Sequence, residues 1–371
     1  NTFDIDDVTS LNLSGRWNWA SLKMEDQYGT ALEGHHFFNE FNPGIGITRK
    51  MGEAPFIGNT TLYATYKESS RTPSVAELGC ADPDQPCRLP NSFQADPPLD
   101  QVKNRSFEFG ARGNKGGYSL LGMDHNINWT ATAFAGRNYN DIIFIGGNRV
   151  GTGYFRNVGN TQRMGTEVSL NGKLGKKWSW YGNYSYVRAS FETHQKISSG
   201  GHAENTYTSL CEGSDAYGAN AAGDTAAEAD QEFCEAKESY QIQIGPGDAI
   251  PGVSPHLGRL GIGYQPNEAF SMFIDAEYNS EQFYRGDENN AQGIKVPGYW
   301  LLNASAEYDM SLSKNDSVRS VFFIEGRNLL NANYETGGIL AENEVEGTGD
   351  SGIFVTPGSP ISIFGGMHFR W

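Results

Sequence analysis

The residues best suited to binding a ligand are aromatic and cationic side chains in polar stretches of the chain. Aromatic rings offer a large contact area, and an arginine can donate two parallel hydrogen bonds to an anionic group. This combination suits a planar or anionic chelate, although aromatic side chains that only pack within loops give the same pattern. The candidate ligand-binding residues are Arg71, Tyr207, Tyr217, Tyr240, Phe283, Tyr284 and Arg285.

Catalytic and metal-binding chemistry have less support in the sequence. An enzyme site needs a nucleophile, a base and an orienting group that converge in one place, and the linear sequence shows no such signature. His35 and His36 are adjacent, but paired histidines in a polar stretch are more often solvated than bound to a metal. We therefore expect no enzymatic activity, no catalytic residue, no metal site and no cofactor.

The four cysteines fall into two pairs, Cys80 with Cys87 and Cys211 with Cys234, each within a polar segment. Because the two members of each pair are near in sequence, two local disulfides are the natural pairing. A zinc site is not indicated, since such sites usually show CxxC or histidines at fixed offsets. Disulfides indicate an oxidising compartment. The chain opens at Asn1 without a start methionine or a signal peptide, so we expect a mature or truncated product.

The formal net charge of -16 is concentrated in two segments. Residues 195–252 hold ten acidic residues against two lysines, and residues 332–357 hold five acidic residues with no lysine or arginine. Nucleic acid is not an expected partner, since phosphate contacts require clustered cations. We expect solvated loops here, with the bridging of divalent cations as the alternative.

Elsewhere, apolar and polar side chains alternate with a period of two, which is typical of strands that have two different faces. No stretch approaches the roughly 18 apolar residues of a membrane-spanning helix, but a membrane β-barrel needs only one apolar residue in two. Helical periodicity is not evident. The twelve expected strands are 11–19, 41–49, 60–67, 106–112, 127–136, 154–172, 178–187, 259–265, 270–279, 299–308, 320–328 and 361–371.

The connections alternate between short and long, which is the plan of an outer-membrane barrel. The first strand then rises toward the long-loop side, and the carboxyl end lies on the periplasmic side. Short turns are expected at 51–58, 172–177, 266–269 and 309–317, and long polar loops at 22–36, 71–101, 192–255, 280–297 and 331–358.

The register of the alternation also predicts the two faces, because a slip of one residue would exchange them. We expect lipid contact for Phe109, Ala131, Ile274, Ala304 and Phe322, and a position in the lumen for Glu108, Thr130, Asp275, Ser305 and Glu325. The composition leaves other classes open: a secreted β-sandwich or propeller, a passive porin-like channel, or an outer-membrane hydrolase barrel.

Several segments resemble the TonB-dependent receptors of the bacterial outer membrane. They are "YATYKESSRTPSVAEL" (63–78), "VKNRSFEFGARG" (102–113), "YNDIIFI", "FRNVGNTQRMGTEVSLNG" (155–172) and "FFIEGRNLLNANYET" (322–336), followed by the aromatic terminal strand. The resemblance covers nearly the whole chain, and the segments occur in the family's order.

This resemblance implies an all-β, transmembrane antiparallel barrel of about 22 strands. Residues 1–371 would be its C-terminal part, with the plug domain and the N-terminal strands absent; closure into a smaller barrel is the alternative. The implied function is TonB-dependent import of a scarce nutrient, foremost a ferric siderophore or similar metal chelate.

The implied location is the outer membrane, which the chain crosses several times. The implied partners are outer-membrane lipid and lipopolysaccharide, the receptor's own plug domain, the TonB complex through the absent N-terminal part, and a siderophore-like ligand. In outer-membrane barrels an aromatic carboxyl-terminal residue on the closing strand serves recognition by the assembly machinery. The resemblance assigns that role to Phe369 and Trp371.

Overall fold

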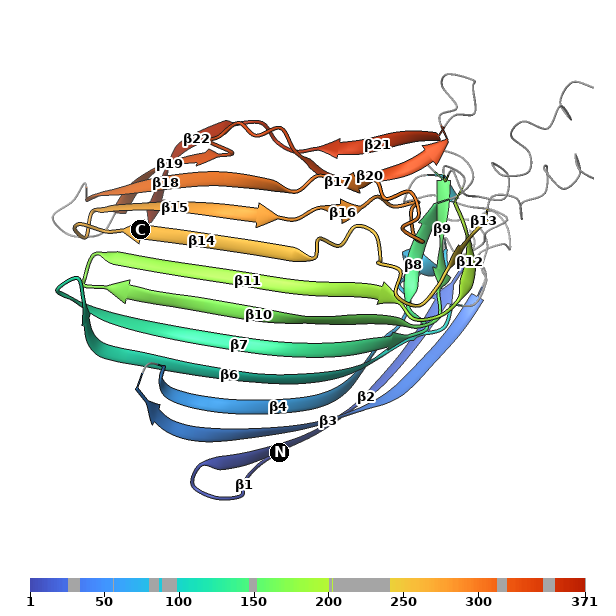
Figure 1. The fold of residues 1–371 in the computed structure, drawn as a ribbon, viewed down its shortest axis with the longest axis horizontal. Coiled ribbons are helices and arrows are strands. Elements are labelled where there is room, and N and C mark those ends of the chain that lie inside the picture. The colour runs from blue at the N-terminus through green and yellow to red at the C-terminus, as the bar shows by residue number, and fades with distance from the viewer. Residues whose placement is uncertain are drawn as a thin grey trace, which may run out of the picture.

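Twelve long strands form one antiparallel sheet, as the alternation predicts (Figure 1). The computed structural model describes residues 1–25, 34–55, 57–79, 87–88, 99–146, 152–199, 202, 241–311, 319–342 and 351–370. Each long strand pairs with the next long strand along the chain, and the three-residue β1 adds a thirteenth member beside β2.

Each long strand of this sheet overlaps a predicted stretch, but several, such as β3 and β6, extend well beyond it. Its two ends are β1 and β22, and among the described residues no pairing joins them. The members are β1 (Thr2–Asp4), β2 (Thr9–Met24), β3 (Gly34–Ala54), β4 (Gly58–Arg71), β6 (Val102–Leu120), β7 (Met123–Tyr139), β10 (Thr161–Leu174), β11 (Trp178–Phe191), β14 (His256–Tyr264), β15 (Phe270–Asn279), β18 (Tyr299–Ser311), β19 (Arg319–Arg327) and β22 (Ser362–Arg370).

Two of the expected boundaries are wrong. The strand expected over 154–172 is two strands, because the chain changes direction at Gly159, whose φ of 72° is a left-handed conformation that favours glycine. Only the second, β10, joins the main sheet. The connection expected over 22–36 is shorter, since β2 continues to Met24 and β3 begins at Gly34.

Short turns close one end of the sheet. Leu121 and Gly122, with φ of 52° and 73°, join β6 to β7 in two residues, as a tight hairpin requires. Between β14 and β15, the Asn267 side chain accepts hydrogen bonds from the backbone N–H groups of Ala269 and Phe270. Local side-chain chemistry therefore fixes these turns.

The other end carries the long connections, which contain secondary structure of their own (Figure 1). A three-stranded sheet is formed by β5, β9 and β8, and three further pairs are β12 with β13, β16 with β17 and β20 with β21. The bounds are α1 (Val75–Leu78), β5 (Cys87–Arg88), β8 (Ile142–Gly146), β9 (Thr152–Asn157), β12 (Gln195–Ser198), β13 (Gln241–Ile244), β16 (Gln282–Phe283), β17 (Lys295–Val296), β20 (Glu335–Glu342) and β21 (Ser351–Pro357).

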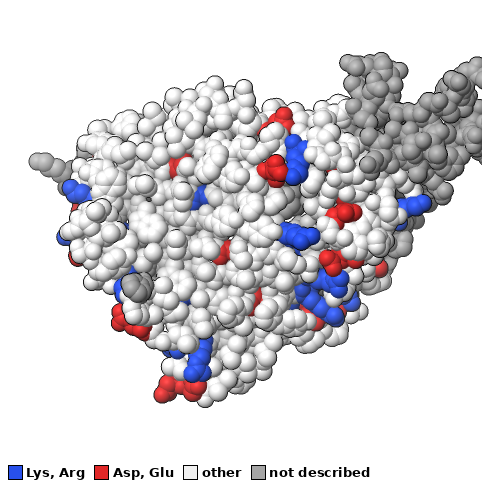
Figure 2. All heavy atoms as spheres, viewed as in Figure 1, with Lys and Arg blue, Asp and Glu red and all other residues white. Residues whose placement is uncertain are grey.

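One face of the main sheet carries large apolar side chains that no other part of the described chain covers. Phe109 is 52% exposed, and Ile274 and Phe322 are each 43% exposed. Ala304 lies directly opposite Ile274, and Ala131 lies on the same face as Phe109. Figure 2 shows few charged side chains over the middle of the strands. An exposed apolar face of this extent indicates a nonaqueous neighbour.

The opposite face is polar and concave. Asp275 is only 7% exposed there, and it accepts hydrogen bonds from Arg259 and Asn303 on the neighbouring strands. A hollow of about 470 Å³ extends over β7, β10, β11, β14 and β15, with Thr130 and Glu277 among its lining residues. Glu108, Ser305 and Glu325 share this face by register, so the predicted division between the two faces agrees with the pairing.

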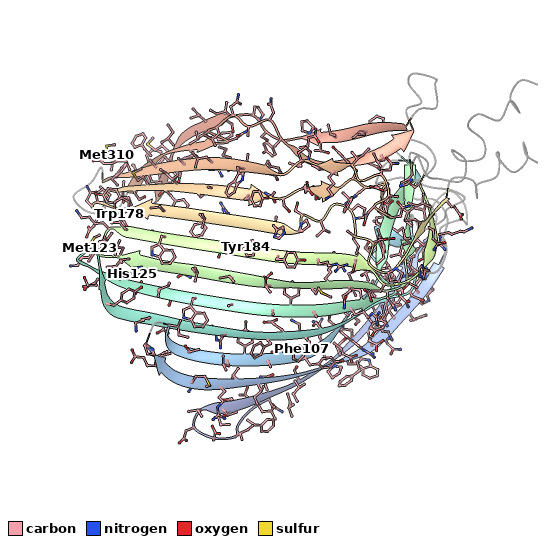
Figure 3. The ribbon with its side chains drawn as sticks, in the orientation of Figure 1. Phe107, Met123, His125, Trp178, Tyr184 and Met310 are labelled. Carbon is pink, nitrogen blue, oxygen red and sulfur yellow. The ribbon has the colours of Figure 1, made fainter. Side chains whose placement is uncertain are left out.

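Aromatic side chains gather near the short turns. The rings of Trp178 and Tyr264 lie 4.3 Å apart, and Trp180 Nε1 donates to His125 Nε2 over 3.0 Å. Figure 3 places Trp178 and His125 near this end, together with Met310. Such a belt is typical of a membrane interface.

Candidate ligand-binding site

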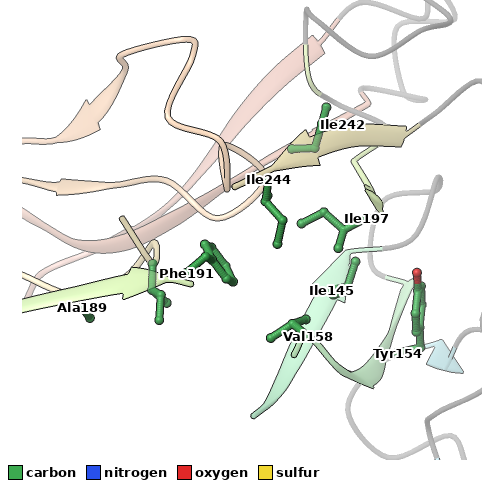
Figure 4. Packing of buried hydrophobic residues seen from close by; sticks show 9 residues of the cluster. Ile145, Tyr154, Val158, Ala189, Phe191, Ile197, Ile242 and Ile244 are labelled. Carbon is green, nitrogen blue, oxygen red and sulfur yellow. The ribbon is translucent and has the colours of Figure 1, made fainter. Parts of the chain in front are cut away.

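The long connections form a packed assembly that we call the outer cap: α1, β5, β8, β9, β12, β13, β16, β17, β20 and β21 with the residues that join them. Much of the buried apolar core of the described chain lies here or at the strand ends below it. The largest cluster (Figure 4) consists of Ile145, Tyr154, Val158, Ala189, Phe191, Ile197, Ile242, Ile244 and Ile250. Segments that the sequence predicts as solvated loops are therefore partly a folded layer.

Asn157 fastens one side of the outer cap to the main sheet. Its side-chain N–H group donates to the backbone oxygens of Asn140 and Asp100 over 2.7 and 3.2 Å, and its Oδ1 accepts from the Asp100 N–H. Nearby, Asp141 accepts hydrogen bonds from Thr161 and Arg163. These contacts hold the segment "FRNVGN" (155–160) against the ends of β6, β7 and β10.

Arg71, the first candidate, lies at the end of β4 beside α1. Its Nη1 donates to both carboxylate oxygens of Glu77, over 2.9 and 2.7 Å. Ser74 and Glu77 form a capping box on the single-turn helix, and Leu78 is fully buried beneath it. Burial raises the pKa of Glu77, but hydrogen bonds from Arg71 and Ser74 outweigh this and hold it below its ordinary value.

Residues 281–292 lie where three long connections meet. The backbone of Arg285 bonds to Gly338 and Leu340 of β20, with N–H donating to Gly338 and O accepting from Leu340. Gly252 donates its N–H to the Phe283 oxygen over 3.1 Å, and Asn290 exchanges hydrogen bonds with the backbone of Ala249. The predicted group of aromatic and cationic side chains thus lies where these connections meet. We call residues 281–292 the junction segment.

Tyr284 faces inward in the junction segment. It is 4% exposed and packs with Val296 and Leu340, and its hydroxyl donates to Glu335 Oε2 over 2.9 Å. Burial, followed by that hydrogen bond, raises the pKa of Tyr284 to about 12. In this conformation the ring supports the outer cap, and its role in ligand binding stays a prediction.

Phe283 and Arg285, on either side of Tyr284, are more accessible than that buried ring. Arg285 is exposed, and Phe283 is half-buried with Lys295 Nζ 4.9 Å from its ring centre. Lys295 also forms an ion pair with Glu281. The junction segment and the adjacent Lys295 therefore present two cationic groups and an aromatic ring, a set that can hold an anionic chelate.

The remaining candidates cannot be placed. Tyr207, Tyr217, Tyr240, Cys80, Cys211, Cys234 and Trp371 lie outside the described residues. Of Cys87 only the backbone is described, in β5 opposite Gly153. Both disulfides thus stay predictions. Phe369 is 47% exposed on the apolar face of β22 at the short-turn end, as its proposed role in assembly requires.

Sequence reasoning missed a buried polar group next to Arg285. His202 Nε2 lies 3.1 Å from Asp287 Oδ1, and both side chains are fully buried. Glu288 beside them is 7% exposed. No local pattern joins residues that are 85 positions apart, and only the acidic pair within "RGDE" offered a signal.

Within the described ranges, no three His, Cys, Asp or Glu side chains are arranged to hold a metal ion. Over the same residues, no helix has the length and apolar character needed to cross a membrane.

Comparisons with known proteins agree with this architecture. A family model described as TonB dependent receptor-like, beta-barrel, matches residues 1–329. A search of curated proteins found no match. Among solved structures, the copper transporter OprC matches with a TM-score of 0.61 at 16% identity, over 99% of this chain and 45% of its own.

Two receptors match in the same way. The siderophore receptor PiuA from Acinetobacter baumannii has a TM-score of 0.60 at 16% identity, over 100% of this chain and 42% of its own. The ferric yersiniabactin uptake receptor FyuA from Yersinia pestis has a TM-score of 0.56 at 12% identity, over 99% and 44%. This chain therefore spans less than half the length of each, and at such identities the likeness shows the fold alone.

Proposed function

Because the chain belongs to the TonB-dependent receptor-like β-barrel family, we propose that the intact protein imports a ferric siderophore or similar metal chelate across the bacterial outer membrane. Members of this family are transporters and receptors, and their barrels lie in the outer membrane. The match over residues 1–329 is the observation that carries the proposal. The titles of two similar structures name a siderophore receptor and a ferric yersiniabactin receptor, which supports this ligand class.

The two faces and the two ends of the main sheet support one orientation of the chain in the membrane. The apolar face would contact lipid, and the concave polar face would form part of the lumen wall. The short turns would lie in the periplasm, and the outer cap would face the medium and contact lipopolysaccharide at its edge. The ligand would meet Phe283 and Arg285 first, because these side chains are accessible at the junction segment.

We further propose that these 371 residues act as the C-terminal part of a larger barrel. Within the described residues the two ends of the main sheet are not paired with each other, and the solved structures that match are more than twice as long. The plug domain and the segment that contacts TonB would belong to the rest of the receptor. Binding in the outer cap cannot by itself drive a ligand against its gradient, so import requires coupling through that part.

Uptake of radiolabelled iron tests the proposal. The intact receptor is expressed in cells that lack other siderophore receptors, and a panel of catecholate, hydroxamate and mixed chelates is supplied, with copper as a separate sample. Accumulation of one chelate should require TonB and the proton-motive force. Equal accumulation without TonB would favour the passive channel instead, and ion conductance through the purified receptor would then identify it.

The binding site is tested by a matched pair of variants. Arg285→Ala removes the exposed cation of the junction segment and should weaken chelate binding. Arg49→Ala removes a cation near the short turns, where the side chain bonds to Thr9, and should leave binding unchanged. Equal binding by the two variants would show that the ligand site does not include Arg285.

A further inference from the structure

The buried group of His202, Asp287 and Glu288 joins two long connections that are far apart in sequence. His202 contacts Asp287 through Nε2 and Oδ1 at 3.1 Å, with neither side chain exposed. Beside this contact, Ser199 Oγ donates to the Gly286 oxygen over 2.6 Å. These bonds attach the end of β12 to the junction segment, which carries Phe283 and Arg285.

Part of this group has no hydrogen-bond partner in the described chain. Asp287 Oδ1 accepts from the Gln292 N–H, and Glu288 Oε1 accepts from the Gly286 N–H. Asp287 Oδ2 and Glu288 Oε2 are buried and have none among the described residues. Two adjacent buried carboxylates that were both charged would leave uncompensated charge away from water, which is strongly unfavourable.

We propose that His202, Asp287 and Glu288 form a proton-controlled latch that holds β12 against the junction segment at mildly acidic pH and releases it as the external pH rises. In the closed latch, His202 Nε2 stays in contact with Asp287 Oδ1, and Glu288 stays neutral beside them. Ionisation of Glu288 would bury a negative charge next to Asp287, on a carboxyl group whose Oε2 has no described partner. The closed arrangement is therefore lost when Glu288 releases its proton.

The direction follows from the surroundings of Glu288. Burial raises the pKa of its carboxyl group above the ordinary 4.5, and the charge of Asp287 adds to the rise, whereas the Gly286 N–H and His202 act against it. Opening exposes the carboxyl group to water and returns the pKa toward its ordinary value. Between the two values, opening releases a proton, so the opening constant grows about tenfold per pH unit.

Among the described residues, three nearby charged groups are engaged elsewhere or exposed. Asp248 of the adjoining 245–250 turn accepts the Gly245 N–H over 2.7 Å, Glu335 accepts from Tyr284, and Arg285 is exposed. The described charges that act most directly on Glu288 are those of His202 and Asp287. The ionisation of Glu288 therefore depends on its burial and on these two neighbours.

Hydrogen exchange tests the latch in the purified intact receptor without any ligand, so the result does not depend on what the protein imports. Amide exchange in residues 195–199 and 284–292 is measured at about pH 5.5 and about pH 8, and each rate is divided by the intrinsic chemical rate. In the wild type, the opening constant should rise between the two conditions, by at most about tenfold for each pH unit. An unchanged opening constant would overturn the proposal.

Two variants distinguish the latch from a general loosening of the outer cap. Glu288→Gln cannot ionise, so protection should stay at the acidic wild-type level under both conditions. Glu281→Gln is the matched control, because Glu281 lies in the same connection with an exposed side chain paired to Lys295, and it should keep the wild-type response. A wild-type response in Glu288→Gln would refute the assignment.

A third variant covers the case in which Glu288→Gln does not fold. His202→Ala removes the contact with Asp287 Oδ1, so protection should be low at both pH values while the barrel resists unfolding by detergent on a gel. Full acidic protection in His202→Ala would show that this contact has no role, and the latch would be abandoned.

Discussion

Substituting Ile274 with arginine tests which face of the sheet meets lipid. Ile274 is the fifth of ten residues in β15 and lies between Ile262 and Ala304 on the neighbouring strands. At about 3.3 Å per residue and a tilt of about 40°, a ten-residue strand crosses roughly 23 Å of membrane thickness. Ile274 then lies about 10 Å from one boundary, close to the midplane.

An arginine at that depth should lower the free energy of unfolding by about 2–4 kcal/mol, because its charge must leave water or distort the bilayer. Ser305→Arg is the control at equal depth, since Ser305 adjoins Ala304 but faces the polar concave side opposite Phe273. We expect a change within about 1 kcal/mol there, because lumen positions remain hydrated.

The measurement is an equilibrium urea titration of the intact receptor in lipid vesicles, followed by tryptophan fluorescence. The two variants should differ by about 1–3 kcal/mol, which corresponds to a factor of about 5 to 150 in the unfolding equilibrium. If Ser305→Arg destabilised the barrel and Ile274→Arg did not, the assignment of lipid and lumen faces would be inverted for every strand.

Three further outcomes follow from the outer cap and the terminal strand. Asn157→Ala removes three hydrogen bonds to Asp100 and Asn140 and should cost about 2 kcal/mol locally, seen as faster amide exchange at the start of β6. Tyr284→Phe removes the hydrogen bond to Glu335 and should lower the free energy of unfolding by about 1–2 kcal/mol. In the wild type, the stability that comes from the protonated Tyr284 hydroxyl is complete below pH 10 and is lost as the pH approaches about 12. Phenolate absorbance would follow this titration. Deleting Trp371 should reduce the amount of receptor at the cell surface, and unchanged abundance by surface labelling would count against its role in assembly.

The main sheet was predictable because its signal is local. Each residue of β15 alternates between two environments, so Ile274 and Asp275 could be assigned to opposite faces from their own neighbours. The pairing of consecutive long strands follows from the chain order alone. Local chemistry also explains the boundary error near residue 159, where one left-handed glycine divides a long alternating stretch.

The outer cap was not predictable in the same way, because its contacts join residues remote in sequence. Ile197 of β12 pairs with Ile242 of β13, and both are buried. Each lies in a short alternating segment within an acidic stretch, where composition favoured a solvated loop. A hydrophobic core built from pairs of residues in separate segments leaves no periodic signal in any one of them.

The family-like motifs indicated where a segment lies in the fold, but not which contacts its side chains make. In "RNLLNANYET", Asn328 has a φ of 49° and is 2% exposed. Its side chain donates to the oxygens of Ala332 and Ser359 and accepts the Ala332 N–H. Asparagine suits this role because it tolerates the left-handed region and offers both a donor and an acceptor.

The junction segment shows how one short stretch can serve both the framework and the ligand. Tyr284 points inward, where Glu335 and Leu340 contact it, whereas Phe283 and Arg285 on either side of it are accessible from outside. Because the inward ring fixes the backbone, the outward pair needs little ordering when a ligand arrives, which lowers the entropic cost of binding. If the latch at Asp287 and Glu288 then loosens, the same outward pair gains freedom without any change in its chemistry. External pH would in that case alter the affinity of the site through the order of its backbone rather than through the charge of Arg285.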